Sequence, residues 1–123
     1  MSYWFFLSAG GLSGIWLAVH LILGGRDIVR PLLTTSELNT VVRDTHYLCW
    51  HLTSVSIACM AGFFLWSALS GTDALAVAGV TLASGFAILG IALVLLRTGS
   101  HADLPQGWLF VPVAALGVAG LLA

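Results

Sequence analysis

Four long apolar stretches, separated by short polar connections, take up almost the whole of this chain. They cover residues 3–24, 45–69, 74–96 and 104–123, and the longest connection covers residues 25–44. A hydrocarbon core of about 30 Å is crossed by about 20 consecutive apolar residues in a helix. The sequence therefore predicts an all-α, polytopic membrane protein, a four-transmembrane-helix bundle that forms a single domain over residues 1–123.

The composition excludes most other classes of protein. Of 123 residues, 59% are hydrophobic and 7% are charged, whereas ordinary soluble domains carry about 25% charged residues. No basic surface is available to neutralise phosphates, so we expect no nucleic-acid partner. Met1 and Ser2 provide no basic n-region, and the apolar stretch that follows is too long for a signal h-region, so we expect the first span to be retained.

The charged residues are distributed asymmetrically between the two sides of the predicted bundle. Both termini and the turn at 72–73 fall on one side, and the connections 25–44 and 97–103 fall on the other. The second side holds all four arginines and, at or near it, all four histidines: Arg26, Arg30, Arg43, Arg97, His20, His46, His51 and His101. Short loops that carry positive residues stay in the cytoplasm. We therefore predict cytoplasmic connections, with both termini outside.

Local signals suggest where the helices end and how they pack. Gly24-Gly25 predicts the end of the first helix, and Thr34 with Glu37 fits a capping box that starts the second helix near Thr35. Small residues let transmembrane helices approach closely. The predicted packing positions are Gly10, Gly14, Gly79, Ala83, Gly117 and Gly120.

The histidines are the main candidates for a functional site, because ionisable residues within a membrane are rare and are often functional. His20 and His51 lie on successive antiparallel spans, at a similar depth near the cytoplasmic rim. Helical periodicity places Asp44 and Tyr47 on the same face as His51, which we expect to point into the bundle. Asp27 continues the face of His20 if the first helix extends that far. The candidate polar cluster is therefore His20, His51, Asp44, Tyr47 and Asp27.

Three interpretations of this cluster are open. The rings of His20 and His51 could hydrogen-bond to Ser, Thr, Tyr or backbone groups and fix helix packing, which is the interpretation we favour. They could instead bind a transition metal, or ligate a haem in a slot that Trp16 and Trp50 line or fill. The third interpretation is proton transfer or ligand binding. His46 and His51 lack the i, i+4 spacing with which two histidines on one helix bind zinc.

No motif in the chain names a reaction. A catalytic triad, paired carboxylates and a phosphate-binding loop are not visible in a suitable setting. No acidic residue lies within the middle of a span, unlike in the proton-coupled small multidrug exporters, which match in size and helix number only. We therefore predict that the protein is not an enzyme.

Several segments carry a resemblance to known proteins. The segment from His20 to Arg26, then Arg30-Pro-Leu-Leu and Tyr47-Leu-Cys-Trp-His51, resembles uncharacterised families of bacterial integral-membrane proteins. The resemblance implies a bacterial inner-membrane protein and no particular activity. We predict a non-catalytic accessory, assembly or packing partner of a larger membrane system, or a homo-oligomer, embedded in the lipid bilayer. The alternative function is a histidine-based metal or haem redox site at the cytoplasmic rim.

Overall fold

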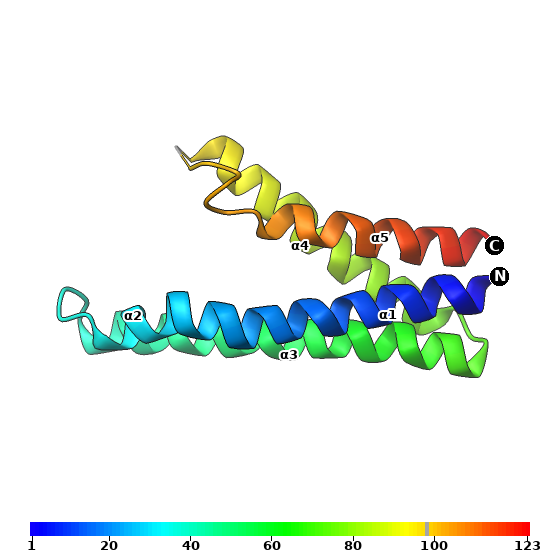
Figure 1. Ribbon diagram of the computed structural model, residues 1–123, viewed down its shortest axis with the longest axis horizontal. Helices are drawn as coiled ribbons and strands as arrows, with labels where there is room; N and C mark the ends of the chain where they lie inside the picture. Colours follow the sequence, from blue (N-terminus) through cyan, green and yellow to red (C-terminus); the bar gives the residue numbers. More distant parts are fainter. Residues whose placement is uncertain (98) are drawn as a thin grey trace.

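The computed structural model describes residues 1–97 and 99–123, which fold into helices without a β-strand (Figure 1). The elements are α1 (Ser2–Val19), η1 (His20–Val29), α2 (Arg30–Thr34), α3 (Thr40–Ser70), α4 (Ala74–Leu96) and α5 (Gln106–Leu122). The first three elements form one continuous helix of 33 residues. Four helical rods therefore make up the described chain, and the prediction of an all-helical fold is confirmed.

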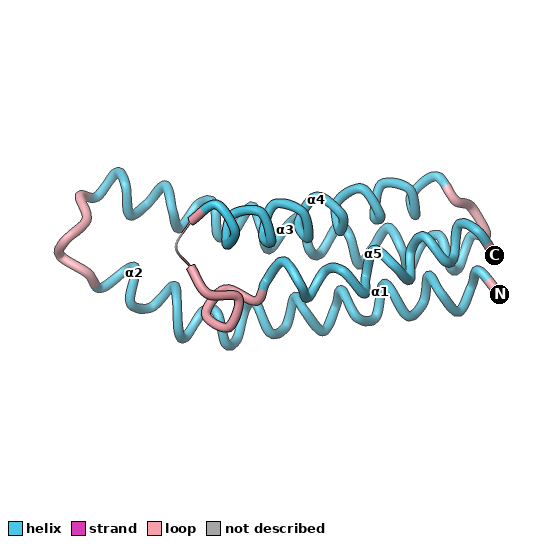
Figure 2. The backbone as a smooth tube through the Cα atoms, turned by 90° about the horizontal axis from the view of Figure 1, so that it is seen from above, coloured by secondary structure: helices cyan, strands magenta, loops and turns pink. Residues whose placement is uncertain are grey.

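The rods run up and down, so that successive helices are antiparallel. Both termini and the turn after Gly71 lie at one end, and the two longer connections lie at the other (Figures 1 and 2). Gly71 ends α3 with a φ of 69°, which a residue without a Cβ adopts without strain. The connection predicted over residues 97–103 includes Thr98, which lies outside the described residues.

Two helix pairs build the bundle. α1 packs mainly against α3, and α4 packs mainly against α5, while α1–α5 and α3–α4 contacts join the two pairs. The pairs lie close together at the end that holds the termini and diverge toward the connections (Figure 1). This divergence produces a gap whose side-chain lining is described below.

Three helices are long and apolar enough to cross a membrane, namely Ser2–Thr34, Thr40–Ser70 and Ala74–Leu96. The fourth, Gln106–Leu122, is apolar but has only 17 residues. At 1.5 Å per residue the first two helices are roughly 45–50 Å long, which exceeds the hydrocarbon core of about 30 Å. The α1–α3 pair therefore extends beyond the α4–α5 pair at the end where most of the arginines lie.

The first helix does not stop at Gly24-Gly25, so that prediction is wrong. The helix widens instead into the π-helical segment η1 and continues to Thr34. The backbone N–H of Arg30, for example, donates to the carbonyl of Gly25, five residues earlier. In these wider turns the backbone hydrogen bonds continue across Gly24 and Gly25, so the helix does not end at the two glycines. π-helical turns occur frequently at functional sites.

The start of the next helix also differs from the prediction. Thr34 does not cap it; the hydroxyl of Thr35 accepts a hydrogen bond from the backbone N–H of Glu37 within the loop. α3 begins at Thr40, and the side-chain oxygen of Asn39 accepts from the N–H of Val42 at 3.0 Å. Asn39 has the extended backbone that an N-cap residue requires. The non-helical connection between the first two rods is therefore residues 35–39, and most of the predicted cytoplasmic loop 25–44 is helical.

Small residues allow bulky rings to fill the centre of the bundle. Phe64 is fully buried, and its ring lies where a Cβ on Gly79 or Gly117 would have to stand. Gly120 similarly faces Phe6, Gly10 faces Leu65, and Ala83 is fully buried. Gly14 differs from the other predicted packing positions, because a Cβ there would meet nothing within 4 Å. The glycine-rich faces therefore serve mainly to close the protein's own bundle.

Candidate functional site

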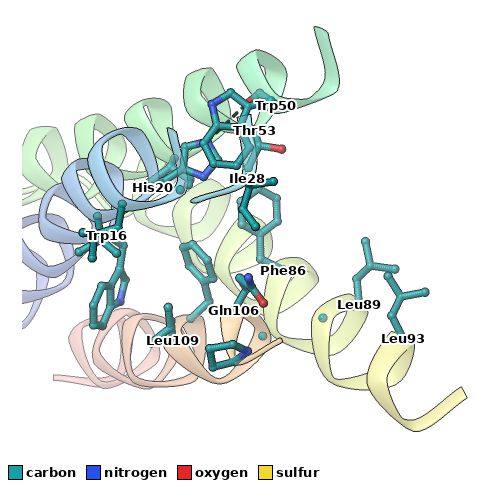
Figure 3. Close-up of a pocket in the computed structure, with 18 of the residues that line it drawn as sticks. Trp16, His20, Ile28, Trp50, Thr53, Phe86, Leu89, Leu93, Gln106 and Leu109 are labelled. Atoms are coloured by element: carbon teal, nitrogen blue, oxygen red, sulfur yellow. Dashed lines mark hydrogen bonds between the residues drawn. The ribbon is translucent and has the colours of Figure 1, made fainter. Parts of the chain in front are cut away.

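A cleft of about 640 Å³ lies between the two helix pairs, where they diverge toward the connections (Figure 3). All four rods contribute to it, and most of the lining side chains are apolar. Aromatic rings come from Trp16, Trp50, Phe86 and Phe110, and polar side chains come from His20, Asp27, Thr53 and Gln106. Clefts of this size and character are typical of sites that hold small molecules.

His20 and Trp50 form one wall of the cleft as a stacked pair. Their ring centroids are 3.8 Å apart and the ring planes differ by 14°. The Nε2 atom of His20 lies 3.0 Å from the hydroxyl of Ser54, which in turn donates to the backbone carbonyl of Trp50 at 3.1 Å. Because the Ser54 proton is used in this way, His20 donates from Nε2–H to Ser54 and keeps Nδ1 as an acceptor.

Gly24 provides the space that Trp50 needs. A Cβ on Gly24 would collide with the far edge of the Trp50 indole ring, whereas a Cβ on Gly25 would meet nothing within 4 Å. His20 and Gly24 lie one turn apart on η1 and together form the seat for the Trp50 ring. The glycine doublet thus has a packing role in which only its first member takes part.

Trp16 lies on the opposite side of the cleft from Trp50, next to α5 (Figure 3). Its Nε1 atom is buried and finds no hydrogen-bond partner among the described residues. Buried tryptophan N–H groups usually have an acceptor. This N–H group is thus an unpaired donor that neighbouring side chains enclose, and it is not open to the cleft.

The α4–α5 pair forms the remaining wall, and its shape depends on two glycines that touch each other. A Cβ on Gly90 would lie 2.6 Å from the Cα of Gly107, and one on Gly107 would lie 2.6 Å from the backbone nitrogen of Ile91. This close approach brings the start of α5, with the side chain of Gln106, to the edge of the cleft (Figure 3).

The structure separates the predicted polar cluster into two groups. His20 and Asp27 both line the cleft, and Asp27 is paired with Arg26 at 2.6 Å. His51 is exposed on the outside of α3, edge-on to the ring of Tyr47 at 4.5 Å. Asp44 is also exposed, 3.5 Å from the Nε atom of Arg43.

The expectation that His51 points into the bundle is therefore wrong. The buried face of α3 is instead formed by Ile57, Met60 and Phe64, which lie at helical spacing on another side of the helix. Large apolar side chains and the seat for Trp50 decide which face turns inward. The more polar sector that includes His51 remains outside.

The structure shows no cluster that resembles a multidentate metal site within residues 1–97 and 99–123, where no three His, Cys, Asp or Glu side chains come together. His46 bonds to the carbonyl of Val42 at 2.7 Å. His101 accepts from the indole N–H of Trp108 at 3.2 Å. The four histidines thus contact different neighbouring groups.

Sequence reasoning raised Trp16 and Trp50 as possible lining residues, but it missed the contribution of α4 and α5. Phe86, Phe110 and Gln106 reach the cleft only because of how the two helix pairs diverge. The one available signal was Gln106, a polar residue at the start of an apolar stretch. Comparison of the chain with protein-family models, with curated proteins and with solved structures finds no match.

Proposed function

We propose that this chain is a non-catalytic membrane protein that binds a small apolar molecule in the cleft and acts as an accessory partner of a larger membrane system. The observation that carries the proposal is the cleft itself, about 640 Å³ in volume and lined by all four rods. Its aromatic and aliphatic walls favour an apolar ligand, and its few polar groups would orient it.

The chemistry of the lining supports binding rather than catalysis. His20 already donates to Ser54 and stacks on Trp50. The carboxylate of Asp27 is held by both the Nε and the Nη2 atoms of Arg26. A general acid or base needs a free proton-accepting or proton-donating atom within reach of a substrate. Nδ1 of His20 is such an atom, but the other titratable side chain of the described lining, Asp27, is already paired with Arg26. The cleft is therefore better suited to recognising a ligand than to reacting with it.

The proposed location is the bacterial inner membrane, with four spans, cytoplasmic connections and both termini outside. The helices of 33, 31 and 23 residues support this arrangement, and α5 adds about 25 Å of apolar helix. A reporter that is active only in the periplasm should be active when fused after Ala123. A reporter that is active only in the cytoplasm should be active when inserted between Thr35 and Asn39. The reverse pattern would overturn the orientation.

The binding function can be tested on protein purified in mild detergent from its native membrane. We expect organic extraction followed by mass spectrometry to recover one class of apolar molecule, at about one molecule per chain. Bulk phospholipid in the proportions of the surrounding membrane, with no enriched molecule, would contradict the proposal.

A metal or haem held by histidine is the second candidate, and the position of His20 in the cleft wall is the observation that favours it. The separation of His20 from the outer face that carries His51 counts against a shared site. The same purified protein distinguishes the two functions. A Soret band or stoichiometric metal that is lost in His20→Ala would show that the protein binds a cofactor rather than an apolar ligand.

A further inference from the structure

The face of α3 that points away from the bundle carries a regular row of exposed residues. This outer row consists of Val41, Thr45, Leu48, Leu52, Val55, Cys59, Gly62, Trp66 and Leu69. Successive members alternate between spacings of four and three residues, which is the seven-residue repeat of helices that pair as a coiled coil. The buried residues of α3, such as Ile57 and Phe64, lie on the opposite side of the helix. The outer row is therefore open to a second helix.

The outer row is longer than a lipid bilayer requires. From Val41 to Leu69 it spans roughly 42 Å at 1.5 Å per residue, whereas the hydrocarbon core is about 30 Å thick. It continues into the part of α3 that extends beyond the α4–α5 pair, where Val41 is 76% exposed (Figure 1). The exposed side chains of Asp44 and His46 beside it are polar, as are the flanks of a coiled-coil seam. Lipid tails around the four spans do not reach this end of the row, whereas a second helix would cover it.

The middle of the outer row is narrow. Cys59 is exposed, and a Cβ on Gly62 would meet nothing within 4 Å. Glycine within a helix is less favourable than alanine, and no contact in the described part of the chain uses the space at Gly62. Small residues let two transmembrane helices approach closely. Cys59 and Gly62 therefore suit a close contact with another helix.

The positions beside the outer row complement each other when a second copy lies parallel. In a parallel coiled coil, the residue before one row position faces the residue five places later on the partner helix. His51, which precedes Leu52, thus faces Ser56 of the second copy. The hydroxyl of Ser56 donates to the carbonyl of Leu52 at 2.8 Å, and its oxygen can still accept. The matching donor is a ring N–H of His51, which is exposed and hydrogen-bonds to no group within residues 1–97 and 99–123.

Two copies inserted in one membrane have the same orientation, so a two-fold axis perpendicular to the membrane places their α3 helices parallel. We propose that the chain forms a homodimer in which the outer rows of two α3 helices pack as a parallel, left-handed coiled coil. Trp50 lies on the opposite side of α3, in the wall of the cleft, so both clefts remain open in the dimer. The dimer is therefore independent of the ligand proposed above.

The two native cysteines provide a direct test. Cys59 belongs to the outer row and lies opposite its counterpart in the dimer, whereas Cys49 lies at a flanking position, too far from its counterpart for a disulfide. The full chain, in liposomes with a large excess of lipid, is treated with copper phenanthroline and separated on a non-reducing gel. We expect a disulfide-linked dimer from the wild type and from Cys49→Ala, and none from Cys59→Ala. No dimer from the wild type, or as much dimer from Cys59→Ala, would overturn the proposal.

A matched pair of glycine variants measures the association itself. Gly62→Ile adds a branched side chain where the helices approach closely, and should raise the Kd of the dimer at least tenfold, measured by energy transfer between labelled chains in liposomes. The control is Gly85→Ile, at an exposed glycine of α4 whose Cβ would also meet nothing within 4 Å, and it should leave the Kd unchanged. His51→Ala should raise the Kd about threefold through the lost hydrogen bond. Equal Kd values for the wild type and Gly62→Ile would overturn the assignment of the interface to α3.

Discussion

Replacing Gly90 by alanine is expected to destabilise the fold by about 1–3 kcal/mol, because the added methyl group has no room between α4 and α5. The new Cβ would lie 2.6 Å from the Cα and 2.8 Å from the backbone nitrogen of Gly107. Backbone atoms cannot turn aside as a flexible side chain can, so the two helices must separate. Separation would also reshape the wall of the cleft, to which both glycines belong.

The matched control is a glycine on the same helix, where we expect alanine to change the free energy of unfolding in the opposite direction. A Cβ on Gly85 would meet nothing within 4 Å, so Gly85→Ala should stabilise the protein by about 0.5–1 kcal/mol through the better helix propensity of alanine. Reversible unfolding of both variants in mixed detergent micelles measures the difference. Equal effects in the two variants would show that the Gly90–Gly107 contact does not set the helix separation.

The large-scale features of this fold were predictable because they depend on the local sequence. Apolar stretches of sufficient length require helices, since a spanning segment must bond its own backbone groups. The turn after α3 follows from Gly71, whose φ of 69° suits glycine. The up-and-down order of the helices then places both long connections, one of them beginning at Arg97, at one end of the bundle.

The features that were mispredicted depend on contacts between distant segments. Gly24-Gly25 is a local stop signal, yet the helix continues because Gly24 receives the ring of Trp50 and the backbone widens into η1. The spacing of polar residues on α3 suggested that His51 faces inward. In the structure the apolar residues of α3 face the centre of the bundle instead. A lipid-facing position tolerates an aromatic or polar side chain near the headgroup level, so polarity alone does not identify the inner face of a membrane helix.

The candidate site was predictable in part for a similar reason. Trp16, His20 and Asp27 share one face of the first helix, and this periodicity is visible in the sequence. The opposite wall depends on the angle between two helix pairs, which the contact of Gly90 with Gly107 helps to set. No local pattern reveals a contact between two glycines on different helices.

Filling the cleft should abolish binding without unfolding the protein. Leu89 lines the cleft but is 60% exposed, so an indole ring at this position would extend into the open space rather than into the packed core. Leu89→Trp is expected to weaken the affinity for the ligand at least tenfold, which corresponds to about 1.4 kcal/mol or more. Its neighbour Ile88 is 69% exposed and lies outside the lining, so Ile88→Trp adds an indole ring to the same helix without blocking the cleft.

The most direct measurement compares the apolar molecules that co-purify from native membranes with the wild type, Leu89→Trp and Ile88→Trp. The cleft-binding function predicts that the wild type and Ile88→Trp carry the same enriched molecule, at about one per chain, and that Leu89→Trp loses it while unfolding at a similar temperature. Equal amounts of that molecule in Leu89→Trp and Ile88→Trp would contradict the claim that the ligand occupies this cleft.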